Sequence, residues 1–256
     1  MSARAEVPAG HSGFRHVARM EWVKLRSLRS TWWAIAIAVA AAAGIGIQAG
    51  ASTSNSAGAG DLTGSALSGA FVGVLLVSVL GVLVMTSEYS SGMIRSTLAA
   101  APRRPVVLAA KAAVFGAVAL VVGEVATFAS FFAAGMALGH GIPAPTLSQP
   151  GVFRALVLTG ASYCLIGLFG LGLGAVIRHT AAGISVLVLG VYVAAQLGGK
   201  AVHLARYAPL HIMQNSLSTP QLRPDNLSAW AGTGMLCLYA AVALAVGGWL
   251  LARRDA

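Results

Sequence analysis

Long apolar runs separated by short polar segments dominate the pattern along the chain. A bilayer core of about 30 Å needs about 20 residues of α-helix to cross it. Six runs reach or approach that length, at residues 31–50, 67–86, 112–138, 155–177, 181–199 and 229–252. Five of them contain no Asp, Glu, Lys or Arg, and the run 112–138 contains only Glu124. Each run is therefore predicted to be a transmembrane helix.

Proline placement and composition support helices in a membrane. All nine prolines lie outside the six runs, as expected where every backbone group must be bonded within its own helix. Hydrophobic residues make up 57% of the chain and charged residues only 9%, against roughly 25% charged in soluble domains. The sequence predicts an all-α, multi-pass protein of the cell membrane, with six transmembrane helices in one domain, 1–256.

The basic residues predict the orientation of these helices. Thirteen of the 17 lysines and arginines fall before the first run, between runs two and three, between runs four and five, or after the last run. Short loops rich in Lys and Arg stay on the cytoplasmic side, so both termini and the loop 87–111 are predicted to be cytoplasmic. The loop 200–228 is predicted to be external. This distribution, together with attraction to anionic membrane lipid, accounts for the net charge of +10, and no nucleic acid is expected as a partner.

The cytoplasmic arm, residues 1–30, includes a segment with two unlike faces. On a helical wheel from Phe14 to Ser30, arginines gather on one side and apolar residues on the other, while Val23 and Lys24 break the pattern. The apolar side holds Phe14, Val17, Ala18, Leu25 and Leu28. This pattern predicts an amphipathic helix in the headgroup plane, with a bend near the break. A solvated basic arm that only sets the orientation is the alternative.

No arrangement of residues indicates an enzyme. The six histidines are scattered, and Cys164 and Cys237 lie in separate apolar runs, so neither a metal site nor a disulfide is expected. The glycines of 170–174 lie within a run and lack the lysine and hydroxyl of a phosphate-binding loop. We expect no catalytic residues, no metal and no directly bound cofactor.

The loop 87–111 carries the most informative local pattern. Gly92 interrupts a polar run, and Pro102 ends the segment that follows. Between them, one helical face collects Met93, Ile94, Thr97 and Leu98. The pattern predicts a short amphipathic helix that inserts into a groove of another protein. A linker that lies flat on the headgroups is the alternative.

The sequence E-Y-S-S-G-M-I-R-S-T-L-A of this loop, followed by P-R-R and by Lys111 at the start of the third run, resembles type-2 ATP-binding-cassette (ABC) exporter permeases. The lead-in 21–33 and the arginines after the last run are also similar to that family. The resemblance implies a transmembrane subunit that pairs as a homodimer or with a sister permease. Two separate ABC subunits would bind and hydrolyse the ATP.

The resemblance also assigns a role to individual residues of the loop. It implies that a coupling helix transmits movement from the ATPase subunits to the spans. The matching positions are Glu88, Tyr89, Gly92, Met93, Ile94, Arg95, Thr97 and Leu98. The expected function is export across the cytoplasmic membrane, with a membrane scaffold as one alternative and an ion-coupled secondary transporter or channel without an ATPase partner as the other.

Glu124 is the one Asp, Glu, Lys or Arg residue within the predicted spans. A charge at that depth is costly, so it is expected to face the bundle interior, water or a partner helix. One interpretation places Glu124 in the transport path, where it attracts a cationic group. The other is a protonated carboxyl group bonded to a neighbouring hydroxyl or carbonyl group.

Overall fold

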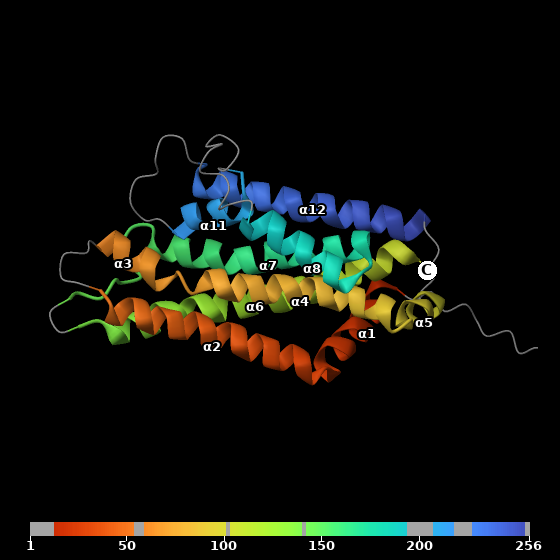
Figure 1. Cartoon of the computed structure of the whole chain (residues 1–256), viewed down its shortest axis with the longest axis horizontal. Coiled ribbons are helices and arrows are strands. Elements are labelled where there is room, and N and C mark those ends of the chain that lie inside the picture. Colours follow the sequence, from red (N-terminus) through yellow and green to blue (C-terminus); the bar gives the residue numbers. More distant parts are fainter. Residues whose placement is uncertain are drawn as a thin grey trace, which may run out of the picture.

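The computed structural model describes residues 13–53, 59–100, 103–139, 142–193, 207–217 and 227–253. Within these ranges the regular elements are helices, and no strand is present among them. The longest helices run side by side along the long axis of the molecule (Figure 1). The all-α prediction is confirmed for the described part of the chain.

Five helices are long and apolar enough to cross a membrane, which confirms a multi-pass membrane protein. They are α2 (Arg29–Ala51), α4 (Ala70–Ser90), α6 (Arg104–Ala137), α7 (Val152–Ile177) and α12 (Ala229–Arg253). The share of residues buried within the most apolar stretch of each span differs between helices. It is 56% for α4, 50% for α6 and 61% for α7, but only 22% for α2 and 28% for α12. The helices α4, α6 and α7 therefore form the core, and α2 and α12 flank it.

The predicted span 181–199 differs from the other five. Its described part is α8 (Thr180–Val188), which continues as a π-helix over Leu189–Val193. The apolar helix Thr180–Tyr192 is about 20 Å long at 1.5 Å per residue, too short to cross a 30 Å core. Residues 194–199 lie outside the described residues. Five of the six predicted spans are thus confirmed, and the count of six is not.

The shorter helices lie at the two ends of the bundle. They are α1 (Phe14–Ser27), α3 (Ala59–Ala66), α5 (Met93–Ala100) and α11 (Pro209–Leu217). Figure 1 places α1, α5 and the last turn of α12 at one end, and α3 and α11 at the other. α11 lies within the predicted external loop 200–228, with Leu210, Ile212 and Met213 buried.

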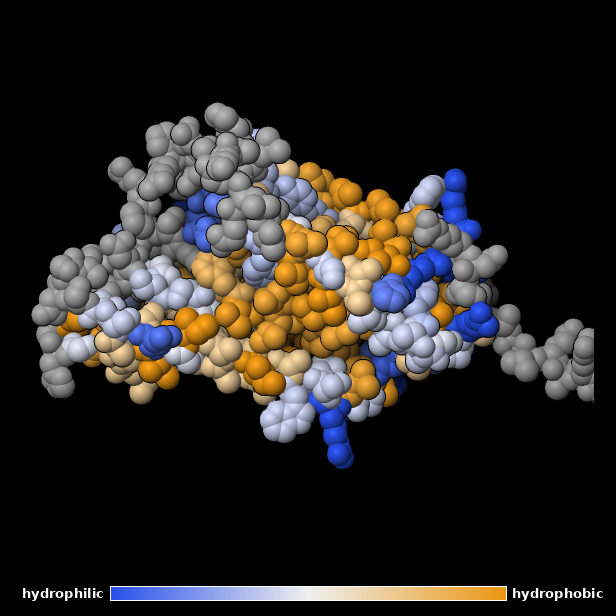
Figure 2. Space-filling model, viewed as in Figure 1, coloured by the Kyte–Doolittle hydropathy of each residue, from blue (hydrophilic) through white to orange (hydrophobic). Residues whose placement is uncertain are grey.

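We call the end that holds α1, α5 and the last turns of α4, α7 and α12 the basic end. Of the described lysines and arginines, Arg154 alone lies away from it. Four exposed tryptophans lie near this end, as expected at a membrane–water interface, namely Trp22, Trp32, Trp33 and Trp249, and Trp230 is exposed at the other end. Figure 2 shows apolar surface between the two ends. By the distribution of positive charge, we expect the basic end to face the cytoplasm.

The first two helices meet at a sharp change of backbone direction. α1 ends at Ser27, Leu28 has an extended backbone (φ −84°, ψ 106°), and α2 begins at Arg29. The predicted bend near Val23 and Lys24 is therefore wrong in position, since α1 is continuous there. The pattern breaks at Lys24 because its side chain turns toward buried acidic residues.

Close packing of α2 on α6 depends on glycine. A Cβ atom built on Gly46 would lie 2.5 Å from the carbonyl oxygen of Ser130, and one on Gly50 would clash with the backbone of Ala134. Small residues at this spacing let helix backbones approach closely in a membrane.

Candidate functional site

Four charged side chains from three helices meet at the basic end. α1 presents a buried stripe of Val17, Glu21 and Leu25, spaced four residues apart on one face. Glu88 lies in the last turn of α4, and Lys111 lies in the third turn of α6. Glu21, Glu88 and Lys111 are each only 2% exposed. Residues far apart in the sequence thus meet in one buried place. We call Glu21, Glu88, Lys111 and Lys24 of α1 the ion network.

Each lysine of the ion network bridges both carboxylates. Lys111 Nζ donates to Glu21 Oε2 at 2.5 Å and to Glu88 Oε1 at 2.7 Å. Lys24 Nζ donates to Glu21 Oε1 at 2.8 Å and to Glu88 Oε1 at 2.9 Å. Lys24 Nζ also donates to Thr97 Oγ1 of α5 at 3.0 Å. The network therefore joins α1, α4, α5 and α6.

The charges of the ion network balance, with two carboxylates and two ammonium groups. Burial of an ion costs several kcal/mol unless it is paired and hydrogen-bonded. Burial lowers the pKa of Lys24, but the hydrogen bonds and charges of Glu21 and Glu88 outweigh this and raise it above 10.5. The stabilisation from Lys24 is therefore complete below pH 10.5 and is lost as the pH rises above that value.

The predicted short amphipathic helix is present as α5 (Met93–Ala100), and most of its apolar stripe faces the protein itself. Ile94 and Thr97 are 3% and 4% exposed. Leu98 packs with Val17 of α1 and Val107 of α6. The side of α5 that remains exposed carries Met93, Arg95, Ser96 and Ala99. The helix is thus placed as predicted. Ile94, Thr97 and Leu98 of its stripe are covered by the protein itself, whereas Met93 is exposed.

The loop that holds α5 is shorter than the predicted 87–111. α4 continues to Ser90 and α6 begins at Arg104, so Glu88 and Lys111 belong to long helices. Gly92 makes the turn into α5 with a φ of +70°, a conformation that glycine adopts without steric cost.

Tyr89 lies against the turn that follows α7. The guanidinium carbon of Arg178, at the end of α7, is 5.1 Å from the centroid of the Tyr89 ring. Arg178 Nη2 also donates to the carbonyl oxygen of Leu250 in α12 at 3.2 Å. The residue after Glu88 therefore connects α4 to the ends of α7 and α12.

Glu124 lies apart from the ion network, at the contact between α6 and α7. Its side chain is partly buried and covers Gly160, where an added Cβ atom would be 2.5 Å to 2.7 Å from the carboxyl atoms. Among the described residues, no lysine or arginine forms an ion pair with it. The structure thus separates Glu124 from the residues of the predicted coupling helix.

Comparison with known proteins adds no relative: no family model matches the chain, and no curated protein matches it. The chain is a helical multi-pass membrane protein on its own sequence and structure.

Sequence reasoning missed three members of the ion network, namely Glu21, Lys24 and Lys111. One signal was available: Glu21 sits between Val17 and Leu25 at four-residue spacing, in the middle of the apolar face of α1. A carboxylate in that position needs a buried partner. No group of three or more potential metal ligands occurs among the described residues, so the site offers ion pairs and hydrogen bonds.

Proposed function

We propose that the chain is the transmembrane permease subunit of an ATP-driven ABC-type exporter. The observation that carries the proposal is α5, a short helix between two long spans at the basic end, anchored on one side and exposed on the other. The sequence of this segment resembles the coupling helix of type-2 ABC exporter permeases. An exposed face on an anchored helix suits a soluble partner that pushes on the membrane helices.

The ion network supplies a route for such a push. Thr97 of α5 accepts a hydrogen bond from Lys24, which is paired with Glu21 and Glu88. Lys111 extends the connection into α6. A displacement of α5 therefore strains contacts to α1, α4 and α6 together, and the strain is relieved when these helices move as a unit.

The remaining parts of the proposal follow from the family resemblance. ATP would bind to two separate ABC subunits, and the chain would pair with a copy of itself or with a sister permease. Alternating access would arise as the two ATPase subunits close and open. Glu124, in the wall between α6 and α7, is the candidate residue of the transport path.

Co-purification from native membranes tests the proposal. We would purify the tagged chain gently and quantify accompanying proteins by mass spectrometry, beside a variant with Met93→Asp and Ser96→Asp. Both positions are exposed on α5, so the ion network is left intact. The matched control is Ser27→Asp with Ser30→Asp, two exposed positions of α1 and α2 at the same end.

We expect an ABC ATPase in near-equal amount with the unaltered chain and with the control, and its loss from the α5 variant. An ATPase retained by all three samples would support the exporter function but would exclude α5 as the surface that binds the ATPase. Absence of any ATPase from intact protein would overturn the proposal.

A second candidate function, an ion-coupled secondary transporter, is favoured by Glu124. This carboxyl group lies in a span without an ion-pair partner among the described residues, and such groups often carry protons in transporters. Transport by the purified chain in vesicles, driven by a proton gradient without ATP, would support this function. Transport that needs ATP and a second subunit would exclude it.

A further inference from the structure

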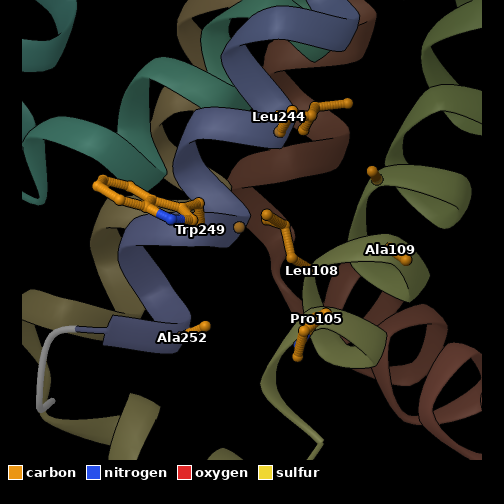
Figure 3. Close-up of a pocket in the computed structure, with 9 residues that line it drawn as sticks. Pro105, Leu108, Ala109, Leu244, Trp249 and Ala252 are labelled. Carbon is orange, nitrogen blue, oxygen red and sulfur yellow. The ribbon is translucent and has the colours of Figure 1, made fainter.

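An apolar groove runs between α6 and α12 near the basic end. It has a volume of about 470 Å³, within the roughly 300 to 1,000 Å³ of small-molecule sites. Its lining comes from both helices: Pro105, Leu108, Ala109, Ala112, Leu244, Ala245, Gly248, Trp249 and Ala252. Figure 3 shows Leu108 and Leu244 pointing into the space between the helices, with Pro105 and Ala252 at the basic end of the groove. None of these described lining residues is titratable.

The groove has the length and depth of one membrane leaflet. From Leu244 to Ala252, α12 rises about 12 Å at 1.5 Å per residue, against about 15 Å for half of a 30 Å hydrocarbon core. Trp249 is 53% exposed, and exposed tryptophans mark the interface level of a membrane protein. The groove therefore extends from the interface into the hydrocarbon of the leaflet at the basic end.

Arginines surround the mouth of the groove. Arg103 precedes α6 and is exposed, and Arg253 ends α12 and is exposed. The guanidinium of Arg253 stacks 4.5 Å from the centroid of the Trp249 ring. Arg104 Nη1 donates to the carbonyl oxygen of Leu251 at 3.1 Å, which ties the start of α6 to the end of α12. Positive charge is thus concentrated where a lipid headgroup would lie.

We propose that this groove binds one acyl chain of an anionic phospholipid of the cytoplasmic leaflet, with the headgroup phosphate at Arg103 and Arg253. The apolar lining fits the chain, the depth fits one leaflet, and the two exposed guanidinium groups complement a negative headgroup. The guanidinium groups at the mouth favour a lipid with an anionic headgroup over the apolar helix of a protein partner. The site is independent of whether an ATPase binds α5.

Quenching of Trp249 fluorescence by brominated lipid tests the site directly. The protein for the test keeps Trp249 and carries phenylalanine at the other four tryptophans, namely Trp22, Trp32, Trp33 and Trp230. It is reconstituted into phosphatidylcholine vesicles that contain either brominated phosphatidylglycerol or brominated phosphatidylcholine. From two arginines at the membrane surface we expect on the order of tenfold tighter association of the anionic lipid. The anionic lipid should therefore quench Trp249 at much lower mole fraction.

Two pairs of variants locate the effect. Ala245→Phe fills the groove and should abolish the preference for anionic lipid, whereas Ala241→Phe, one turn away on the same helix and also exposed, should keep it. Arg103→Gln with Arg253→Gln should make the two lipids quench Trp249 equally. The matched control changes two exposed arginines of α1, Arg19→Gln with Arg26→Gln, and should keep the stronger quenching by the anionic lipid.

Two results would overturn the proposal. Equal quenching by both lipids in the unaltered groove would mean that only ordinary surrounding lipid is present. If neither lipid quenches Trp249, the groove is closed to lipid, as it would be if a second copy of the chain covered it.

Discussion

The ion network and Glu124 are two ways of placing carboxylates in or beside membrane helices. In the network, Glu21 and Glu88 share two lysines at distances of 2.5 Å to 2.9 Å. Glu124 has a glycine for its neighbour on α7 and no ion pair among the described residues. In the ion network the charges of the carboxylates are neutralised by the lysines. The carboxyl group of Glu124 has no such neutralising partner among the described residues.

The difference indicates what each group can do. A balanced, buried set of ions resists separation of its members, so it fixes helices relative to one another. An uncompensated carboxyl group in a span can change its protonation state or bind a cation without breaking an ion pair. We therefore assign mechanical connection to the network and reserve transport or proton binding for Glu124.

Removal of one lysine from the ion network is the strongest test of this comparison. Lys111→Met leaves two buried carboxylates with one partner, and we expect a loss of about 3–5 kcal/mol in the free energy of unfolding. Denaturant titration of the purified protein in micelles measures it. The second change Glu21→Gln restores the balance of charge and should recover part of the loss. A loss below about 1 kcal/mol, the size of an ordinary hydrogen bond, would contradict a buried network.

Gly160→Ala probes the space that holds Glu124. The new methyl group would lie 2.5 Å to 2.7 Å from the carboxyl atoms, and we expect a loss of about 1–3 kcal/mol from overpacking. In a Glu124→Ala background the cost should shrink, which a double-mutant cycle detects. Gly44→Ala is the control, since nothing lies within 4 Å of its added Cβ atom. Equal costs with and without the Glu124 side chain would place Glu124 elsewhere.

Gly92→Ala acts on the turn between Glu88 and α5. Because φ is +70° there, a side chain should cost about 1–2 kcal/mol, seen as a lower denaturation midpoint. Gly234→Ala, in α12 and with open space around it, is the control and should cost less. If Gly92→Ala has no effect on stability, the turn has another conformation in solution.

Glu124→Gln should change stability least, by less than about 1 kcal/mol, because the amide keeps the shape of a partly buried side chain without its charge. Its informative readout is cellular accumulation of a panel of cationic and neutral fluorescent compounds. We expect selective retention of cationic compounds if the carboxylate lines the path. An unchanged accumulation pattern would remove Glu124 from the path and leave it a structural role.

The five confirmed spans could be predicted because each is a long apolar run without a competing pattern. The run 181–199 is equally apolar, yet its α-helix gives way to π-helical bonding at Leu189. Hydropathy measures how favourably a side chain transfers from water into lipid. It carries no information on which hydrogen-bonding pattern the backbone adopts. The sequence therefore could not reveal that change.

The position of α5 was predictable, whereas its covering was not. Gly92 and Pro102 bracket the helix in the sequence, and the wheel groups Met93, Ile94, Thr97 and Leu98 on one face, of which Met93 is exposed. The same pattern serves burial against the chain itself or against another protein, so only the tertiary structure assigns the face to α1 and α6. The pairing of Lys111 with Glu21, 90 residues away, has no local signal beyond the acidic residue on an apolar face.

The ion network has a consequence for the order in which the protein is made. Glu21 and Lys24 leave the ribosome before Glu88, and Lys111 follows last, because chains are synthesised from the amino terminus. Until α6 enters the membrane, Glu21 lacks its closest partner, Lys111, and the charges at the docking position of α1 are not balanced. Docking of α1 on a balanced set of charges therefore has to wait for α6. A chain that stalls before α6 leaves Glu21 and Glu88 to share Lys24 alone, with one negative charge uncompensated.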